Sequence, residues 1–267
     1  MPALANSSAN DLMPVVYIPH GGGPMPLLGE PGHKELIQFL NAVPNTLPKP
    51  KAIVMISAHW ESDVASISSG SRPGMIYDYG GFPAETYEYQ YPAAGNPDLA
   101  EKIATLVSQQ GIECRLDPLR GYDHGTFVPL MLMYPNADIP VVQVSLLQSF
   151  NPAQHIALGQ ALAPLREQGV LIIGSGMSFH YSQGSDEDNK QFDDWLCHTL
   201  VTRSSPEVTQ ELINWEAAPA ARNNHRREEH LLPLHVCWGA ASNQNRSAEK
   251  IFSGLLFNRR ISGFLWR

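Results

Sequence analysis

The chain has 267 residues, of which 43% are hydrophobic and 16% charged, and its formal net charge is −8 at pH 7. This composition is typical of a folded globular protein, and the length is sufficient to bury a substantial core. The acidic balance, with no basic cluster beyond residues 223–230, argues against a nucleic-acid-binding surface. No apolar run approaches ~20 residues, so we expect no membrane-spanning segment.

Residues 1–13 lack the basic start and the apolar segment of a signal peptide, and we expect them to be a disordered tail ahead of one domain over residues 14–267. The three cysteines, at positions 114, 197 and 237, are far apart and form no C-x-x-C pair. This spacing favours a reducing compartment and excludes a disulfide framework or a zinc ribbon. We therefore expect a cytoplasmic protein, which as far as the sequence shows is a monomer or a homodimer.

Four segments rich in β-branched residues and bounded by turn residues predict buried strands. They span residues 14–18, 51–57, 139–146 and 169–176. Helix-like stretches lie between them, at residues 33–43, 96–111 and 151–169. This alternation predicts a single α/β domain with a central, largely parallel or mixed β-sheet flanked by helices. The polar segments 184–190 and 240–250 are expected to be surface loops.

Histidines follow three of the four predicted strands. His20 and His59 come directly after the first two strands, and His180 comes shortly after the fourth. Because ligands bind at the carboxyl ends of the strands in open α/β sheets, we expect these side chains to converge on one site. His124 lies between glycines in the segment GYDHGTF, which predicts a functional loop. Three other histidines fall in helix-like segments and are expected at the surface or at helix ends: His33, His155 and His198.

The segment HGGGP at residues 20–24 allows three interpretations. Its glycines suit a tight turn with positive φ. An HGGG segment after a strand can also supply the oxyanion hole of an α/β hydrolase, but that chemistry needs a G-x-S-x-G elbow. The chain contains no such elbow, and GSGMS at 174–178 is the nearest match. A metal site fits better, because neutral imidazoles bind zinc, iron and related ions.

A third ligand is expected from the segment RREEHLLPLHVCWGAA at 226–241. Its candidate ligands are Glu228, Glu229, His230 and His235. If a helix begins near Leu231, residues five apart point about 140° away from each other, so His230 and His235 do not face the same ion. His230 is the better candidate because it lies at the helix entrance, with Pro233 tolerated in the first turn.

Taken together, these motifs resemble the class III extradiol ring-cleavage dioxygenases, and most closely their DOPA-dioxygenase branch. The resemblance runs from about residue 14 to the C-terminus and preserves the order and spacing of eight motifs. They are HGGGP (20–24), SAHWE (57–61), YDYGGFP (77–83), YPAAGNPDLA (91–100), YDHGTFVPL (122–130), MYPNADIPVVQVS (133–145), GSGMSFH (174–180) and EHLLPLHV (229–236). The resemblance implies that residues 14–267 form a catalytic domain that cleaves a catechol, such as L-DOPA or a related compound, with O₂ to give a semialdehyde.

The resemblance also implies roles for five histidines. His20, His59 and His230 match the family's metal ligands. His180 matches the histidine that either completes the metal coordination or acts as acid and base beside it. His124 matches the histidine that contacts the substrate or oxygen.

One position departs from the wider family. Many class III enzymes use two histidines and a glutamate, whereas this chain has His230 at the third position, as in the DOPA branch. Glu228 or Glu229 is then a candidate ligand or supporting group. Members of this branch have been associated with both Fe(II) and Zn(II), so the expected cofactor is one divalent metal, Fe(II) for activity or Zn(II) as bound.

Substrate contacts are expected from the aromatic segment 77–92, which predicts either a lid over the pocket or a packed surface loop. If it is a lid, Tyr79, Tyr87 and Tyr91 are the candidate substrate-binding residues. Two further functions stay open. A zinc-dependent hydrolase would use the same histidines to activate water and would need no O₂. A metal-binding protein without catalysis is the other, although the presence of both His124 and His180 argues against it.

Overall fold

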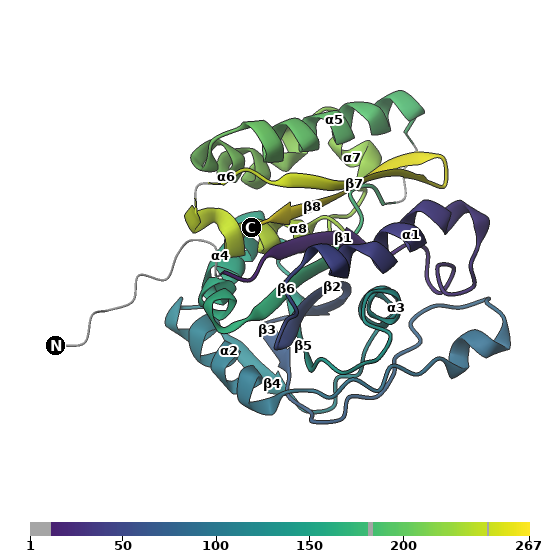
Figure 1. The fold of residues 1–267 in the computed structure, drawn as a ribbon. Coiled ribbons are helices and arrows are strands. Elements are labelled where there is room, and N and C mark those ends of the chain that lie inside the picture. The colour runs from purple at the N-terminus through teal and green to yellow at the C-terminus, as the bar shows by residue number, and fades with distance from the viewer. Residues whose placement is uncertain (1–11, 181–183, 245) are drawn as a thin grey trace.

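The computed structural model describes residues 12–180, 184–244 and 246–267, so most of the expected N-terminal tail lies outside the described residues. Its centre is an eight-stranded mixed sheet in the order β4-β3-β5-β2-β6-β1-β8-β7 (Figure 1). The predicted α/β fold with a mixed sheet flanked by helices is thereby confirmed.

The four predicted strands form the centre of the sheet. They are β1 (Val15–Pro19), β2 (Ala52–Ser62), β5 (Val141–Leu147) and β6 (Val170–Gly176). All four are parallel, with β2 between β5 and β6, and β6 next to β1. Such strands are buried on both faces, which explains why each is rich in apolar residues on both of its faces.

The sequence did not predict the outer strands. They are β3 (Ala65–Ser68), β4 (Cys114–Asp117), β7 (Glu249–Leu256) and β8 (Arg259–Trp266). β3 is antiparallel to β5, and β8 is antiparallel to β1. β3 and β4 have only four residues each, and β7 at the sheet edge is partly exposed, so these three carry no strong apolar signal. β8 was missed although it is buried from Ile261 to Trp266.

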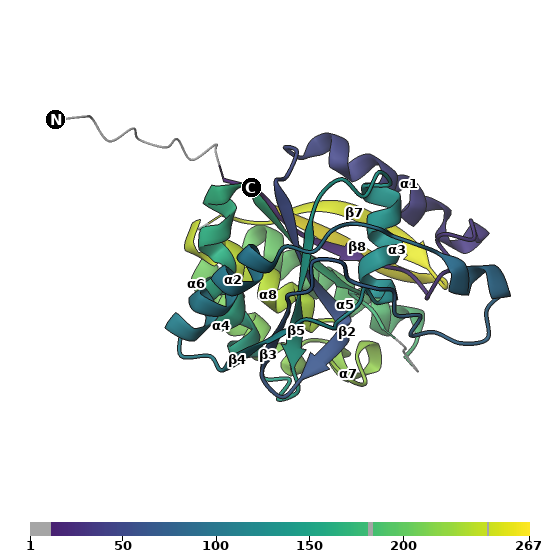
Figure 2. The same cartoon turned by 90° about the horizontal axis from the view of Figure 1, so that it is seen from below.

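Alternating side chains of the central strands belong to two separate hydrophobic cores, one on each face of the sheet. Val15 and Tyr17 of β1 belong to one core, whereas Val16 and Ile18 belong to the other. Helices α1 (Lys34–Ala42) and α3 (His124–Met133) cover the second core. The first core is covered by α2 (Pro97–Gln109), α4 (Pro152–Leu162), α5 (Asp186–Thr202), α6 (Ser205–Ile213), α7 (Ala221–Asn224) and α8 (Leu232–Ala241). Figure 2 shows α1 and α3 on one side of the sheet and α2, α4 and α8 on the other.

Short 3₁₀ helices connect several of these elements. They are Pro31–His33, Val43–Thr46, Ala84–Glu88, Ala163–Gln168, Trp215–Ala217 and Ser242–Gln244. Within the described part of the chain, no helix is both long and apolar enough to cross a membrane.

Helix starts follow local capping chemistry. Asn96 and Asn151 precede α2 and α4, and each side chain accepts a hydrogen bond from a backbone N–H of the first turn, as their Asn-Pro sequences predict. The expected surface loop at 184–190 was wrong, because Ser185 and Asp188 form a capping box that starts α5. The expected loop at 240–250 was also wrong at its ends, which belong to α8 and β7.

Candidate functional site

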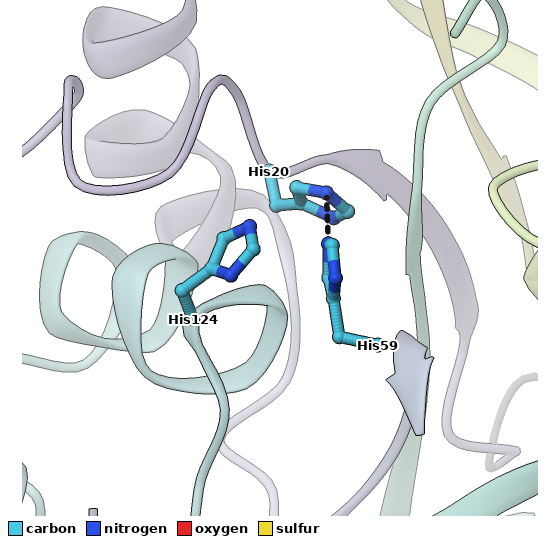
Figure 3. Close-up of side chains that lie close together, drawn as sticks. All are labelled: His20, His59 and His124. Carbon is cyan, nitrogen blue, oxygen red and sulfur yellow. Dashed lines mark hydrogen bonds between the residues drawn. The ribbon is translucent and has the colours of Figure 1, made fainter. Parts of the chain in front are cut away.

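Five histidines from different parts of the chain line one cavity of about 740 Å³. His20 and His180 follow β1 and β6, and His230 immediately precedes α8. Figure 3 shows His20, His59 and His124 side by side, with the imidazoles of His20 and His59 facing each other. The structure therefore brings together all five histidines that the sequence singled out.

Two of these histidines lie on elements that differ from the expectation. His59 lies inside β2 and not after it, because the strand continues to Ser62. His124 is the first residue of α3 and not part of a loop. The side chain of Asp123 caps this helix by accepting a hydrogen bond from the Thr126 N–H.

The imidazoles differ in their spacing. Nε2 of His20 lies 3.2 Å from Nε2 of His59. The ring centroids of His20, His59 and His230 form a triangle with sides of 4.9, 4.9 and 5.2 Å. The centroids of His59 and His124 are closer, at 3.9 Å, and the ring of His180 stacks on that of His230 at 3.4 Å with 17° between the planes.

Each imidazole places its Nδ1 atom beside an oxygen. Nδ1 of His20 lies 3.0 Å from Ser175 Oγ. The Nδ1 atoms of the other four rings lie beside two carboxylates. Asp78 lies 2.8 Å from Nδ1 of His124 and 3.4 Å from Nδ1 of His59, while Glu229 Oε1 lies 2.9 Å from Nδ1 of His230 and 3.2 Å from Nδ1 of His180.

The carboxylate hydrogen bonds favour one tautomer for three of these rings. An ionised carboxylate only accepts hydrogen bonds, so His124, His180 and His230, when neutral, carry the proton on Nδ1 and the lone pair on Nε2. This is the arrangement by which supporting carboxylates orient metal-binding histidines. The cluster therefore offers Nε2 lone pairs to a metal or a substrate.

The tautomer of His20 is set by a hydrogen-bond donor that is missing from helix α3. Pro129 inside this helix has no N–H, so the carbonyl of Gly125 lacks its normal helical donor. The hydroxyl of Ser175, on β6, donates to that carbonyl instead. Because its proton is used there, Ser175 Oγ accepts from His20, which places the His20 proton on Nδ1.

Burial keeps the central imidazoles neutral. It lowers the pKa of His20 and His230 well below the ordinary value, and neighbouring imidazoles lower both further, while Glu229 partly opposes this for His230. Burial together with His124 lowers the pKa of His59 to about 4.

The two supporting carboxylates are ionised. Burial alone raises the pKa of Asp78, but its hydrogen bonds from His124 outweigh this and lower the pKa to about 2. Burial also raises the pKa of Glu229, and the hydrogen bonds from His180 and His230 again outweigh it and hold that pKa well below the ordinary value.

The backbone of His230 is fixed by β1 and β6. The Tyr17 hydroxyl and the Met177 N–H each donate to the His230 carbonyl, both at 3.0 Å. Gly176 allows this approach, because a Cβ atom there would lie 2.2 Å from the same carbonyl oxygen. His235, in contrast, turns away from the cluster and places Nε2 2.9 Å from the Leu212 carbonyl.

Aromatic side chains form much of the remaining cavity wall. Among the expected tyrosines, Tyr79 lines the cavity formed by the described residues, but Tyr87 and Tyr91 do not. The Tyr87 ring contacts that of Tyr79, with centroids 5.4 Å apart. Tyr91 is buried in the core and donates to the Tyr134 carbonyl, so it is a packing residue.

Two of the histidines expected at the surface or at helix ends are buried, although His33 does lie at a helix end, as the N-cap of α1. His33 accepts a hydrogen bond from the Gly22 N–H at 3.1 Å. His155 accepts one from the Leu147 N–H at 3.1 Å. His198 is exposed on α5, as expected.

Two groups of three potential metal ligands occur among the described residues, each with ligand atoms within 4.8 Å of one another. One group is His20, His59 and His124, and the other is His180, Glu229 and His230. The ligand set implied by the sequence takes members from both. Sequence reasoning missed Asp78 and Ser175, although Asp78 lies within the motif YDYGGFP.

Comparisons with known proteins point the same way. A family described as "Catalytic LigB subunit of aromatic ring-opening dioxygenase" matches residues 14–261. The chain is 40% identical to a 4,5-DOPA dioxygenase extradiol from Beta vulgaris, covering 91% of this chain and 92% of the relative. It is 39% identical to dioxygenase tasH from Hapsidospora irregularis, covering 90% of this chain and 82% of the relative. A crystal structure of an uncharacterized protein from Escherichia coli K12 superposes with a TM-score of 0.75 at 25% identity, over 96% of this chain and 100% of that one.

Proposed function

This chain belongs to the LigB family of aromatic ring-opening dioxygenases, and from that premise we propose that its five-histidine cluster cleaves the ring of a catechol with O₂ at an extradiol bond. L-DOPA and related catechols are the proposed substrates, since several relatives of this chain are named 4,5-DOPA dioxygenases. The observation that carries the proposal is that all five Nδ1 atoms lie 2.8–3.4 Å from an oxygen, which directs the Nε2 side of the rings toward a metal or a substrate.

The cluster fits one divalent metal held by His20, His59 and His230. Imidazoles that bind one tetrahedral ion through nitrogen at ~2.0 Å have ring centroids about 5 Å apart. The observed triangle of 4.9, 4.9 and 5.2 Å agrees with this spacing. Neutral imidazoles suit both Fe(II) and Zn(II), and we propose Fe(II) for activity. The metal would supply adjacent binding positions for the catechol oxygens and O₂, which makes their reaction effectively intramolecular.

We propose that His180 moves protons and is not a ligand of the same ion. A metal lies in the plane of an imidazole that binds it, and two stacked rings whose planes differ by 17° share no point close to both Nε2 atoms. The His180 side chain is 38% exposed and lines the cavity. With its proton on Nδ1 facing Glu229, Nε2 is free to take a proton from a catechol hydroxyl and to return it later.

The fifth histidine, His124, lies beside the substrate and does not bind the metal. Its ring lies closer to that of His59 than two ligands of a tetrahedral ion would. Because its Nδ1 proton faces Asp78, neutral His124 accepts a hydrogen bond at Nε2, and it donates one to a substrate oxygen only after it takes up a proton.

The proposal is tested by loading metal-free protein with Fe(II) or Zn(II) without oxygen and then adding L-DOPA or 4-methylcatechol in air. O₂ uptake and visible absorbance are followed together. We expect a yellow product, with one O₂ consumed per catechol, in the Fe(II)-loaded protein. Absence of O₂ uptake with either metal and every catechol would overturn the proposal and favour a zinc-dependent hydrolase, which esters and amides would then test.

A further inference from the structure

The β7–β8 hairpin ends at the cavity in a two-residue turn. Phe257 and Asn258 form this turn, and both have positive φ, at 51° and 61°. Such a turn favours Asn-Gly, and a bulky residue such as phenylalanine rarely adopts this conformation. Strained backbone conformations of this kind occur mainly at functional sites, where the required position of a side chain outweighs the local conformational cost.

The Phe257 ring occupies a defined place on the cavity wall. It lines the cavity although it is 56% exposed. The ring packs against the glycine-rich segment at residues 20–24. A Cβ atom on Gly22 would lie 2.8 Å from the Phe257 ring. The ring of His33 supports it edge-on, with centroids 5.4 Å apart, and His33 is itself held by Glu30. The turn therefore places an exposed aromatic ring at the cavity wall, in contact with His33 and Gly22.

Arg259, directly after the turn, also lines the cavity. Among the described residues of the cavity wall it is the only lysine or arginine. Its Nη2 donates to the Gly184 carbonyl at 2.9 Å, and its Nη1 pairs with Asp186. Asp186 also lies on the cavity wall, but its side chain is 84% exposed, and ion pairs with such exposed partners contribute little. A carboxylate inside the cavity is a stronger partner for a guanidinium, because it is less screened by water and can bind through both oxygens.

We propose that this hairpin tip selects the substrate, with Phe257 packing against the catechol and Arg259 binding a carboxylate on its ring substituent. The inference rests on the proposed function only for the presence of a catechol in the cavity. It assigns a preference for catechols with an acidic side chain to Arg259, and it assigns a ring contact that all catechols share to Phe257, both outside the histidine cluster.

The test compares two catechols that differ by one carboxylate, 3-(3,4-dihydroxyphenyl)propionate and 4-ethylcatechol. Their Kd values for Zn(II)-loaded protein are measured by calorimetry without oxygen, so that no turnover is needed. We expect wild-type protein to prefer the acid about tenfold, which corresponds to ~1.4 kcal/mol. We expect Arg259→Met to abolish this preference, and Arg259→Gln, a second variant in case the first does not fold, to do the same.

Arg260→Met is the matched control. Arg260 is the next residue and also pairs with an exposed carboxylate, Asp194 at 3.2 Å, but it does not line the cavity. This variant should keep the preference for the acid. Equal losses for both catechols in Arg259→Met, loss of the preference in Arg260→Met, or no preference in the wild type would each overturn the proposal.

Phe257→Asn tests the aromatic contact separately. Asparagine suits the left-handed turn at least as well, so the melting temperature should not fall. We expect both catechols to bind several-fold more weakly, because both lose the same ring contact. Unchanged binding would remove Phe257 from the proposal. The O₂-uptake assay with 4-methylcatechol stays a separate measurement, so failure of the proposed reaction is distinguishable from failure of this selection.

Discussion

Replacement of Ser175 by alanine tests how the cluster prepares His20 for metal binding. The change removes one oxygen atom, but it leaves two buried groups without a partner, namely the Nδ1–H of His20 and the carbonyl of Gly125. Pro129 has no N–H to offer that carbonyl. Each buried polar group left without its hydrogen bond costs about 1–3 kcal/mol, so we expect a total loss of about 3 kcal/mol in the free energy of unfolding.

The same change should weaken metal binding. Without Ser175, His20 is free to carry its proton on Nε2, and that tautomer offers no lone pair to a metal. Loss of a partner that orients a metal-binding histidine typically weakens the affinity about 10- to 100-fold. The melting temperature of metal-free protein should fall by roughly 6–12 °C, since 1 kcal/mol corresponds to about 2–4 °C in a domain of this size.

The assay is competition for Zn(II) against a chelator of known affinity, combined with thermal unfolding of the metal-free protein. Ser145→Ala is the matched control. Ser145 is likewise a buried strand serine, but its hydroxyl forms its hydrogen bonds with the backbone of Ser66 and Val64 and not with a histidine. It should lower the melting temperature and leave Zn(II) affinity unchanged. A Ser175→Ala protein that melts earlier but binds Zn(II) within twofold of the wild type would refute the tautomer argument.

Three further predictions follow from the site. His180→Ala should lower turnover about 10²- to 10⁴-fold and retain the metal, as measured by metal analysis alongside O₂ uptake, whereas loss of the metal would make His180 a ligand. Gly176→Ala should lower Zn(II) affinity at least about tenfold, because the new Cβ atom would lie 2.2 Å from the His230 carbonyl oxygen. Gly74→Ala is the control, since a Cβ atom there would have no heavy atom within 4 Å, and it should bind Zn(II) normally. Metal-free protein should lose stability as the pH falls from about 6.5 to 4. Folding lowers the pKa of His59 to about 4 and that of His225 to about 3, so in this pH range the unfolded chain binds protons at these histidines that the folded chain does not bind. A constant melting temperature across this range would contradict that assignment.

The sequence was sufficient where the signal is local. The buried parallel strands are rich in β-branched and other apolar residues, and Asn96 and Asn151 begin helices through hydrogen bonds within one turn. The convergence of His20 and His180 followed from their positions after such strands, because the carboxyl ends of parallel strands meet at one edge of the sheet.

The sequence failed where the partner is distant in the chain. His33 and His155 have polar neighbours, but the N–H groups that they accept from belong to Gly22 and Leu147, on other elements. Ser175 is one serine among many until the fold places it between β1 and α3. Such long-range contacts decide which polar residues are buried, and no local pattern records them.

The two supporting carboxylates determine the charge of the whole cluster. Asp78 and Glu229 are ionised and the central imidazoles are neutral, while the nearby Arg227 is balanced by its two bonds to Glu61. The two carboxylates therefore place two negative charges beside the neutral central imidazoles, and a bound dication would offset them. A catechol that binds with both hydroxyls deprotonated adds two more negative charges. His124 and His180, each paired with one of these carboxylates, are two places where the displaced protons can be stored, so the substrate can bind with little change in the net charge of the cavity.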